Sequence, residues 1–334
     1  MTRKPSRRPL AEKWLARMEA VDPNAPEDET VARELAGLFT DYLKACRHDD
    51  TALSMLPPGR FLMPGDLAGS PALTFAPLAT DDTPPSGSLG RMMARRYEAY
   101  KSVVVKPFFR EHFARLDRQI VLIDALHALN AGPEAVADLA SAISDILGSF
   151  RPGRNSWLSA ILTRRIDRIL IAATKADHLH HADHDRLEAI LGHLLAPSVD
   201  RATAAGALVE IAALASVRAT REGVVVERGE RLPSIIGTPM TDERVNGERF
   251  DGKTEIALFP GDLPDDPESV LEAVESISEA SAQSKKPAPI LDRPLRFVRF
   301  RPPKLERTAE GMTLSLPHIR LDRALQFLIG DRLA

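Results

Sequence analysis

Three short apolar runs, each followed by polar residues, constrain the fold of this chain more than any other feature. They cover residues 120–123, 169–173 and 208–215. Each is short and apolar at nearly every position, which is typical of strands that are covered on both faces. Helical patterns of ten or more residues separate the runs, and this alternation is typical of parallel sheets. We therefore predict an α/β fold with a mostly parallel sheet.

Different patterns flank this core. Helical patterns precede it, whereas the turn pairs Asn246-Gly247 and Asp251-Gly252 after residue 223 are typical of antiparallel hairpins. A last apolar pattern predicts a helix that packs back on the core. We therefore divide the chain into a helical region, a core, a β-rich insertion and a C-terminal helix, at 1–118, 119–222, 223–316 and 317–334.

Three helices are expected around the apolar runs. One starts near Leu89 and runs towards Asp117, with a bend at Pro107, which has no N–H to donate. Another covers about 133–147 and ends before Gly148. The third runs from Asp183 to about Leu195.

Composition excludes several classes of protein. With 44% hydrophobic and 27% charged residues, the chain has ordinary globular composition, and its net charge of -3 gives no reason to expect a nucleic-acid partner. The single cysteine, Cys46, excludes an internal disulfide. No apolar run approaches the roughly 20 residues of a membrane span. We expect a cytoplasmic protein, and five basic residues among the first thirteen leave a peripheral position at the inner membrane open.

The segment Thr174-Lys175-Ala176-Asp177 follows the second apolar run. Ligands of open α/β sheets bind at this end of the strands. A carboxylate such as Asp177 can accept two hydrogen bonds from guanine, from a donor pair that adenine lacks. The stem of Lys175 can lie along the base. The alternative is a capping aspartate beside a solvated lysine. We expect Thr174, Lys175 and Asp177 to bind a guanine base.

Two further candidates follow the other runs. Asp124 ends the first run, where P-loop proteins hold Mg²⁺ through water; a simple turn residue is the alternative. GTPases often place a glycine three residues later, but here the residue is His127, so the group that orients the attacking water is unassigned. Ser216 and Val217 follow the third run and are placed to offer backbone N–H groups to the base, unless they are a simple strand exit.

Four histidines lie within seven residues, just after the base-binding candidate. A metal site is one interpretation, because two of them can share a helix face. We favour a helix start with Asp183 as its cap. The histidines are His178, His180, His181 and His184.

The order of these segments, together with residues 317–331, resembles the YcjX-like family of P-loop GTPases, also described as stress-induced nucleoside-triphosphate-binding proteins. The resemblance covers nearly the whole chain. It implies a Ras-like P-loop NTPase core that binds GTP or GDP with Mg²⁺ and, in the intact protein, hydrolyses GTP. It implies that Asp124 lies on the Mg²⁺ side of the site. It also implies that Thr174, Lys175 and Asp177 contact the base, and that Ser216 and Val217 form the loop that faces the base.

The resemblance has one large gap. We expect no segment of the chain to match the phosphate-binding loop, G-x-x-x-x-G-K-[ST], which cradles phosphates with backbone N–H groups. We therefore expect an N-terminally truncated, inactive chain without the first strand of the core. That strand would lie between the strands at 120–124 and 169–173, so we expect both to have unpaired edges. Direct pairing of the two is expected to move the base loop away from the metal side. The competing hypothesis is a nucleotide-sensing scaffold without catalysis, working with a membrane-associated partner.

Overall fold

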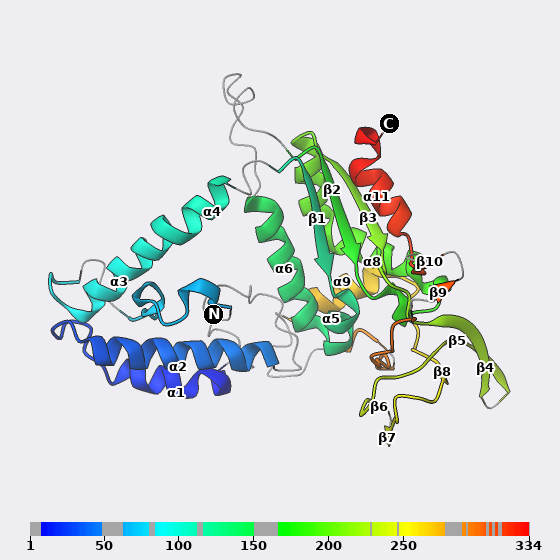
Figure 1. Ribbon diagram of the computed structural model, residues 1–334, viewed down its shortest axis with the longest axis horizontal. Helices are drawn as coiled ribbons and strands as arrows, with labels where there is room; N and C mark the ends of the chain where they lie inside the picture. The colour runs from blue at the N-terminus through cyan, green and yellow to red at the C-terminus, as the bar shows by residue number, and fades with distance from the viewer. Residues whose placement is uncertain are drawn as a thin grey trace. The chain divides into compact units, whose positions relative to one another are not determined.

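The computed structural model describes most of the chain (Figure 1). It forms two compact units, 1–115 and 116–334, which we describe separately. The described residues are 8–48, 63–79, 84–111, 116–149, 166–227, 229–245, 247–277, 289–291, 293–304, 307–308, 311–312 and 316–333.

The second unit is built on a parallel sheet of β1 (Arg118–Ile123), β2 (Arg168–Ala173) and β3 (Leu208–Ala213), in the order β1-β2-β3. These strands match the three apolar runs. The predicted α/β class with a parallel sheet is therefore confirmed.

The expectation of two unpaired edges between the first two strands is wrong. β1 pairs directly with β2, in a continuous register from Arg118 opposite Arg168 to Ile123 opposite Ala173. The N–H and hydroxyl of Thr174 both donate to the carbonyl of Ile123, at 2.8 and 3.0 Å, and extend the pairing past the strand ends. Direct pairing satisfies the backbone groups that would otherwise be left without partners.

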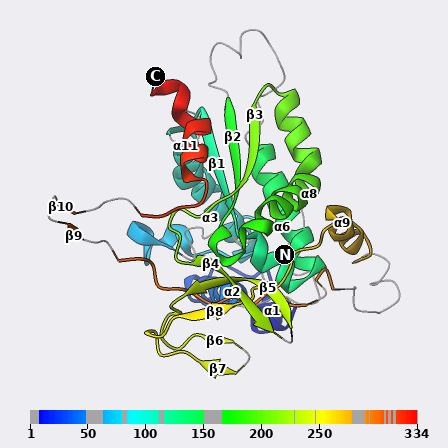
Figure 2. The same cartoon turned by 90° about the vertical axis from the view of Figure 1, so that its right-hand side faces the viewer.

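Helices lie on both sides of this sheet (Figure 2). The helices α6 (Pro133–Ser149) and α8 (His184–Ala204) lie on one side, and α11 (Leu321–Ile329) lies on the other. Ala324 of α11 is buried against apolar side chains of β2 and β3. The last helix therefore packs on the core, as expected.

On the α11 side of the sheet, the helix does not fully cover β1. In the parallel register, Ile120 and Leu122 stand opposite Leu170 and Ala172, which pack against α11. Yet Ile120 is 44% exposed and Leu122 is 62% exposed. Burial on both faces, which the apolar runs predicted, therefore holds for β2 and not for β1.

The β-rich region contains an antiparallel sheet of β4 (Arg221–Glu227), β5 (Glu230–Gly237) and β8 (Ile256–Leu258). The region also contains two separate two-stranded sheets. One pairs β6 (Arg244–Val245) with β7 (Glu248–Arg249), and the other pairs β9 (Arg307–Thr308) with β10 (Gly311–Met312). The region also holds a helix that the sequence analysis did not predict, α9 (Pro267–Glu275).

The first unit is helical, with α1 (Arg8–Glu19), α2 (Glu29–His48), α3 (Leu89–Tyr100) and α4 (Lys106–Glu111). The helix predicted from Leu89 is interrupted by a π-helical turn at Lys101–Val105, just before Pro107. Residues 112–115 lie outside the described part, so the predicted continuation to Asp117 is not seen. Among the described helices, none is long and apolar enough to cross a membrane.

Candidate functional site

The base-binding candidate forms a strained loop at the end of β2. Lys175 adopts a left-handed conformation, with φ 62° and ψ 32°, and the next three residues, Ala176–His178, form a 3₁₀ turn. A residue other than glycine in this region is uncommon, and such strain clusters at functional sites. The loop therefore has a backbone that the surrounding structure must hold in place.

Asp177 links this loop to the one that follows β3. Its side chain is 6% exposed, and its Oδ2 accepts a hydrogen bond from the N–H of Ala219 at 3.1 Å. Its backbone carbonyl accepts the hydroxyl of Thr220 at 2.6 Å. A third bond joins the N–H of Ala176 to the carbonyl of Leu214, at 3.2 Å. The two predicted base-facing loops are thus one connected unit.

The loop with Ser216 and Val217 lies between these attachment points. Ser216 is exposed and Val217 is half-buried. Ala215 pairs with Ile319 through two backbone hydrogen bonds, of 3.2 and 2.8 Å, and the N–H of Arg218 donates to the carbonyl of Pro317 at 2.6 Å. The segment before α11 therefore holds both ends of this loop.

Asp124, the predicted metal-side carboxylate, caps the short helix α5 (Ala125–Ala131), its Oδ1 lying 3.4 Å from the N–H of His127. Its Oδ2 lies 2.6 Å from Nζ of Lys175. The expectation that direct strand pairing moves the base loop away from the metal side is therefore wrong. Because β1 and β2 are in register and adjacent, the residues that follow them meet.

A small cavity of about 120 Å³ lies beside this ion pair. Asp124, Lys175 and His178 line one part of it, and Glu243, Phe297 and Arg299 of the β-rich region line another. Ligand pockets usually measure about 300–1,000 Å³. This cavity is therefore smaller than a typical ligand pocket.

Sequence reasoning missed the contribution of the β-rich region. Glu243 and Arg299 form an ion pair of 2.5 Å at the border of the cavity. Phe297 lies in the segment 293–299, which has no regular structure. Neither spacing nor residue type links this segment to residues more than one hundred positions away, so no sequence signal marked it.

The fit of Mg²⁺ to these residues is limited. Mg²⁺ is usually bound by one or two carboxylates, with substrate phosphates and water completing its shell. Asp124 offers one carboxylate, and Lys175 neutralises it. Asp124 therefore fits a water-mediated contact to Mg²⁺ only where Lys175 is not paired with it.

The phosphate-loop pattern does occur in the chain, at Gly247–Thr254, so the expectation that no segment matches it is wrong. Its structure excludes the usual role. The pattern includes β7 and ends just before β8, so a strand follows it and not a helix. The carboxylate of Asp251 already accepts the N–H groups of Lys253 and Thr254, at 2.7 and 2.9 Å. A working phosphate loop leads from a strand into a helix and leaves such groups free for phosphate.

Two of the four histidines help to shape the site. Nε2 of His184 lies 2.9 Å from the carbonyl of Ala176 and so donates to the base loop. Burial lowers the pKa of His184, although this hydrogen bond acts in the opposite direction. His178 packs near the rings of Phe297 and Phe300, and burial lowers its pKa too.

Asp183 occupies the predicted capping position, but its side chain does not cap the helix. The carboxylate is buried and pairs with Arg186 at 2.8 Å, and burial raises its pKa. The role predicted for the Asp183 side chain is therefore wrong.

His180, His181 and Glu222 bring three potential metal-binding atoms within 4.8 Å of one another. Nδ1 of His180 lies 3.3 Å from the N–H of Ala182 and accepts it. A neutral ring then carries its proton on Nε2, the nitrogen that faces Glu222, and this atom cannot ligate a metal. The arrangement favours a loop-ordering role for these histidines.

Comparison with known proteins agrees with this architecture. The YcjX-like family, DUF463, matches residues 1–333. A relative in Escherichia coli (strain K12), the "Ras-like GTPase YcjX", is 34% identical over 329 residues, which is 96% of this chain. A second protein of that name, from Shewanella oneidensis, is 30% identical over 97% of this chain.

The chain spans 63% and 62% of the lengths of these two relatives. Its parallel sheet and surrounding helices are consistent with the Ras-like fold that their name states. Because the family match covers residues 1–333, this chain belongs to the YcjX-like family.

Proposed function

We propose that this chain carries the base-recognition part of a guanine-nucleotide-binding protein. The observation that carries the proposal is the buried Asp177, whose carboxylate and backbone carbonyl both hold the neighbouring loop. A carboxylate at the end of a central strand, fixed between two loops, is suited to read the edge of a base. The names of the two relatives point to the same class of ligand.

Guanine recognition follows from the number of hydrogen bonds that Asp177 can accept. Its Oδ2 already accepts Ala219, but an ionised carboxylate has about four acceptor positions, so it can accept further donors. Guanine offers two adjacent donors on one edge, and adenine does not. A site built around such a pair discriminates strongly, because the wrong base leaves buried polar groups without partners.

We further propose that a form of the protein that also carries a working phosphate-binding loop hydrolyses GTP with Mg²⁺. Phosphoryl transfer depends on positioning and on charge stabilisation. Within this chain, Asp124 is the residue placed at the metal side, and Lys175 lies beside it. When bound, Mg²⁺ would neutralise phosphate charge, while Asp177 orients the base. The 334-residue chain alone is expected to show no turnover.

One observation favours a nucleotide sensor without catalysis as the second candidate. The third residue after Asp124 is His127, whose N–H faces the Asp124 carboxylate as part of α5. A glycine N–H at this place is common in GTPases that position water, and a helical His127 replaces that arrangement. GTP turnover by a form with a working phosphate loop decides between the two candidates.

Base recognition can be tested on the chain itself. Guanosine and adenosine, which lack phosphate, are titrated by NMR, and guanosine is expected to bind weakly but in preference to adenosine. Asp177→Asn keeps an acceptor for Ala219 but loses the charge that guanine needs, so the preference should fall. Asp200→Asn, an exposed change in α8, is the matched control. Equal binding of the two nucleosides by the unmodified chain contradicts the proposal.

A further inference from the structure

A second and much larger cavity, of about 750 Å³, lies between the end of α5 and the β-rich region. Its size is typical of small-molecule sites. It is lined by polar and aromatic groups, including Asn130, Phe259, Arg293, Leu295, Arg296 and Phe297. None of the residues assigned to the base or to the metal side lines it. It is therefore a second cavity, distinct from the small one beside Lys175, although Phe297 lines both.

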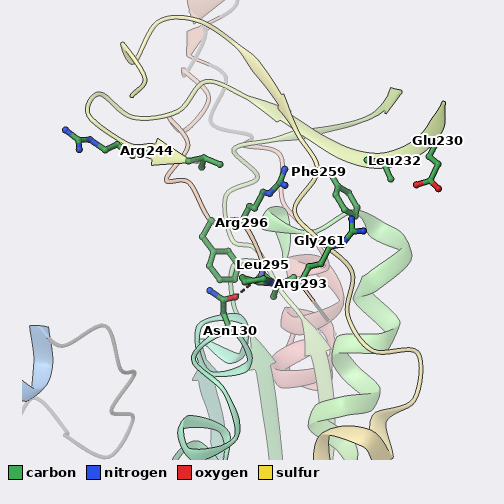
Figure 3. Close-up of a pocket in the computed structure, with 12 residues that line it drawn as sticks. Asn130, Glu230, Leu232, Arg244, Phe259, Gly261, Arg293, Leu295 and Arg296 are labelled. Carbon is green, nitrogen blue, oxygen red and sulfur yellow. Dashed lines mark hydrogen bonds between the residues drawn. The ribbon is translucent and has the colours of Figure 1, made fainter. Parts of the chain in front are cut away.

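The charge of this cavity is positive. Three arginines, Arg244, Arg293 and Arg296, line it, against a single carboxylate, Glu230. Figure 3 shows Arg293 and Arg296 on the Phe259 side, whereas Arg244 extends away from them. Within the described residues, no ion pair neutralises Arg293 or Arg296. Among the described residues, most other arginines of this unit have carboxylate partners, so these two guanidinium groups are available to an anionic ligand.

The backbone at Arg296 is held by hydrogen bonds. The N–H of Leu295 donates to Oδ1 of Asn130 at 2.8 Å, and the N–H of Arg296 donates to the carbonyl of Pro260 at 2.8 Å. Leu295 is 4% exposed. Gly261 has φ +94°, and a Cβ there would lie 3.2 Å from Leu295, so a glycine allows this close approach. Arg296 thus stands on a segment that hydrogen bonds and packing hold in place, as a binding site requires.

We propose that this cavity binds a small phosphorylated molecule through Arg293 and Arg296. The planar guanidinium group matches phosphate with two parallel hydrogen bonds, and it remains charged at every physiological pH. The rings of Phe259 and Phe297 border the cavity and provide apolar contact for the rest of the ligand. A concave site of this size favours a small molecule over an extended acidic peptide.

The cavity is connected to the candidate nucleotide site in two ways. Asn130 lies near the end of α5, the same helix that Asp124 caps at its start. Phe297 lines both this cavity and the small one beside Lys175. A ligand held by Arg296 would therefore restrain the segment that borders Asp124. This inference does not depend on guanine recognition.

Pyrophosphate is the probe, titrated calorimetrically into the chain at low ionic strength. We expect binding that weakens at least tenfold in the Arg293→Gln/Arg296→Gln double variant and less in each single variant. Arg231→Gln removes the same charge from β5 at a residue that does not line the cavity, and should leave binding unchanged. If the double variant unfolds early in a thermal melt, the single variants carry the comparison.

Competing anions and a second variant distinguish phosphate binding in this cavity from general charge attraction and from binding beside Lys175. Citrate is expected to bind at least tenfold more weakly than pyrophosphate, and equal binding would overturn the preference for phosphoryl groups. Loss of pyrophosphate binding in Lys175→Gln, with no change in the arginine variants, would place the anion at the other cavity and overturn the proposal. Binding of a polyglutamate peptide without binding of pyrophosphate would overturn it as well.

Discussion

The ammonium group of Lys175 lies 2.6 Å from the Asp124 carboxylate, so the residue assigned to the base neutralises the residue assigned to the metal side. The two side chains are 53% and 38% exposed. A base and a metal ion would compete with this contact from opposite sides. The structure therefore pairs the two candidate residues with each other.

Removing the Asp124 charge should free Lys175 for the base. Exposed ion pairs are worth about 0.2–1 kcal/mol, so Asp124→Asn is expected to raise guanosine affinity up to about fivefold. Lys175→Gln should instead lower it. NMR titration with guanosine measures both, with Asp200→Asn as the control. Weaker guanosine binding by Asp124→Asn would show that the carboxylate supports the base loop.

Asp177 is expected to contribute to stability as well as to recognition. Asp177→Ala leaves the N–H of Ala219 without its acceptor, at a cost of about 1–3 kcal/mol if that group stays buried. For a unit of this size, each kcal/mol lowers the melting temperature by about 2–4 °C. Asp177→Asn keeps an acceptor and should melt closer to the unmodified chain. Equal melting temperatures for the two variants would contradict this role.

Arg320 links α11 to α8 and adopts a left-handed conformation, with φ 55°. Its guanidinium group pairs with Asp185 at 2.7 Å and also with Glu188. Arg320→Ala loses both pairs and keeps the strain, whereas Arg320→Gly loses the pairs and relieves it. Because this strain costs about 1–2 kcal/mol in a residue other than glycine, the glycine variant should be the more stable one. Urea denaturation measures the difference.

Hydrogen exchange of backbone amides gives an independent test of the ion pairs of Arg320. The loop with Ser216 is held by Pro317 and Ile319, which directly precede Arg320. Its amides should therefore exchange faster in Arg320→Ala, while those of β2 remain protected. Unchanged exchange in this loop would show that the backbone bonds suffice without the ion pairs.

The buried histidines predict that acid destabilises the second unit. Burial lowers the pKa of both His178 and His184 below the ordinary value of 6.5. The unfolded chain then binds more protons than the folded one just below pH 6.5, so stability falls as the pH falls through this window. Around His184, the Ala176 carbonyl and Glu222 favour the charged ring, whereas Arg320 and Arg218 oppose it.

Melting temperatures at pH 7.5 and pH 5.5 test whether acid destabilises the second unit. The unmodified chain should melt lower at pH 5.5, and the His178→Phe variant should lose part of that difference. Asp183 has the opposite effect on the pH dependence of stability. Burial raises its pKa above 3.8, so its contribution to stability falls as the pH rises from that value. A melting temperature that is higher at pH 5.5 would contradict the dominance of the histidines.

The uncovered side chains of β1 should make the chain prone to self-association. Leu122 and Ile120 are exposed side by side on one face of an edge strand, and exposed edges invite pairing between chains. Leu122→Thr is expected to reduce both hydrophobic-dye fluorescence and aggregation. Val103→Thr, at a 71% exposed position in the first unit, is the control. Equal effects of the two substitutions would point to general surface hydrophobicity.

Continuous apolar runs made the core predictable. The residues of β2 from Ile169 to Ala173 are at most 5% exposed, which is the pattern that identified a strand covered on both faces. Periodicity also predicted the helices beside it. It could not predict that α8 continues through Pro197 to Ala204, because packing against the sheet outweighs the one hydrogen bond that a proline removes.

The candidate site was predictable only in part. Each residue at the end of a strand could be recognised from its neighbours, and the structure brings Asp124, Lys175 and Asp177 to one edge of the sheet. The contact between Lys175 and Asp124 depends on which strands are adjacent, which local sequence does not determine. The pattern at Gly247–Thr254 shows the reverse: a segment that matches the motif letter for letter forms the short strand β7 and the turn after it, and no helix follows.

The bonds between Ala215 and Ile319 also have a consequence for biosynthesis. Residue 319 leaves the ribosome long after residue 215, with the whole β-rich region translated between them. The nascent chain can therefore pair its three parallel strands early, while the base-facing loop stays without its partner until the last helix emerges. Domains fold as units during synthesis, so this delay keeps the site unfinished until translation of the region is complete.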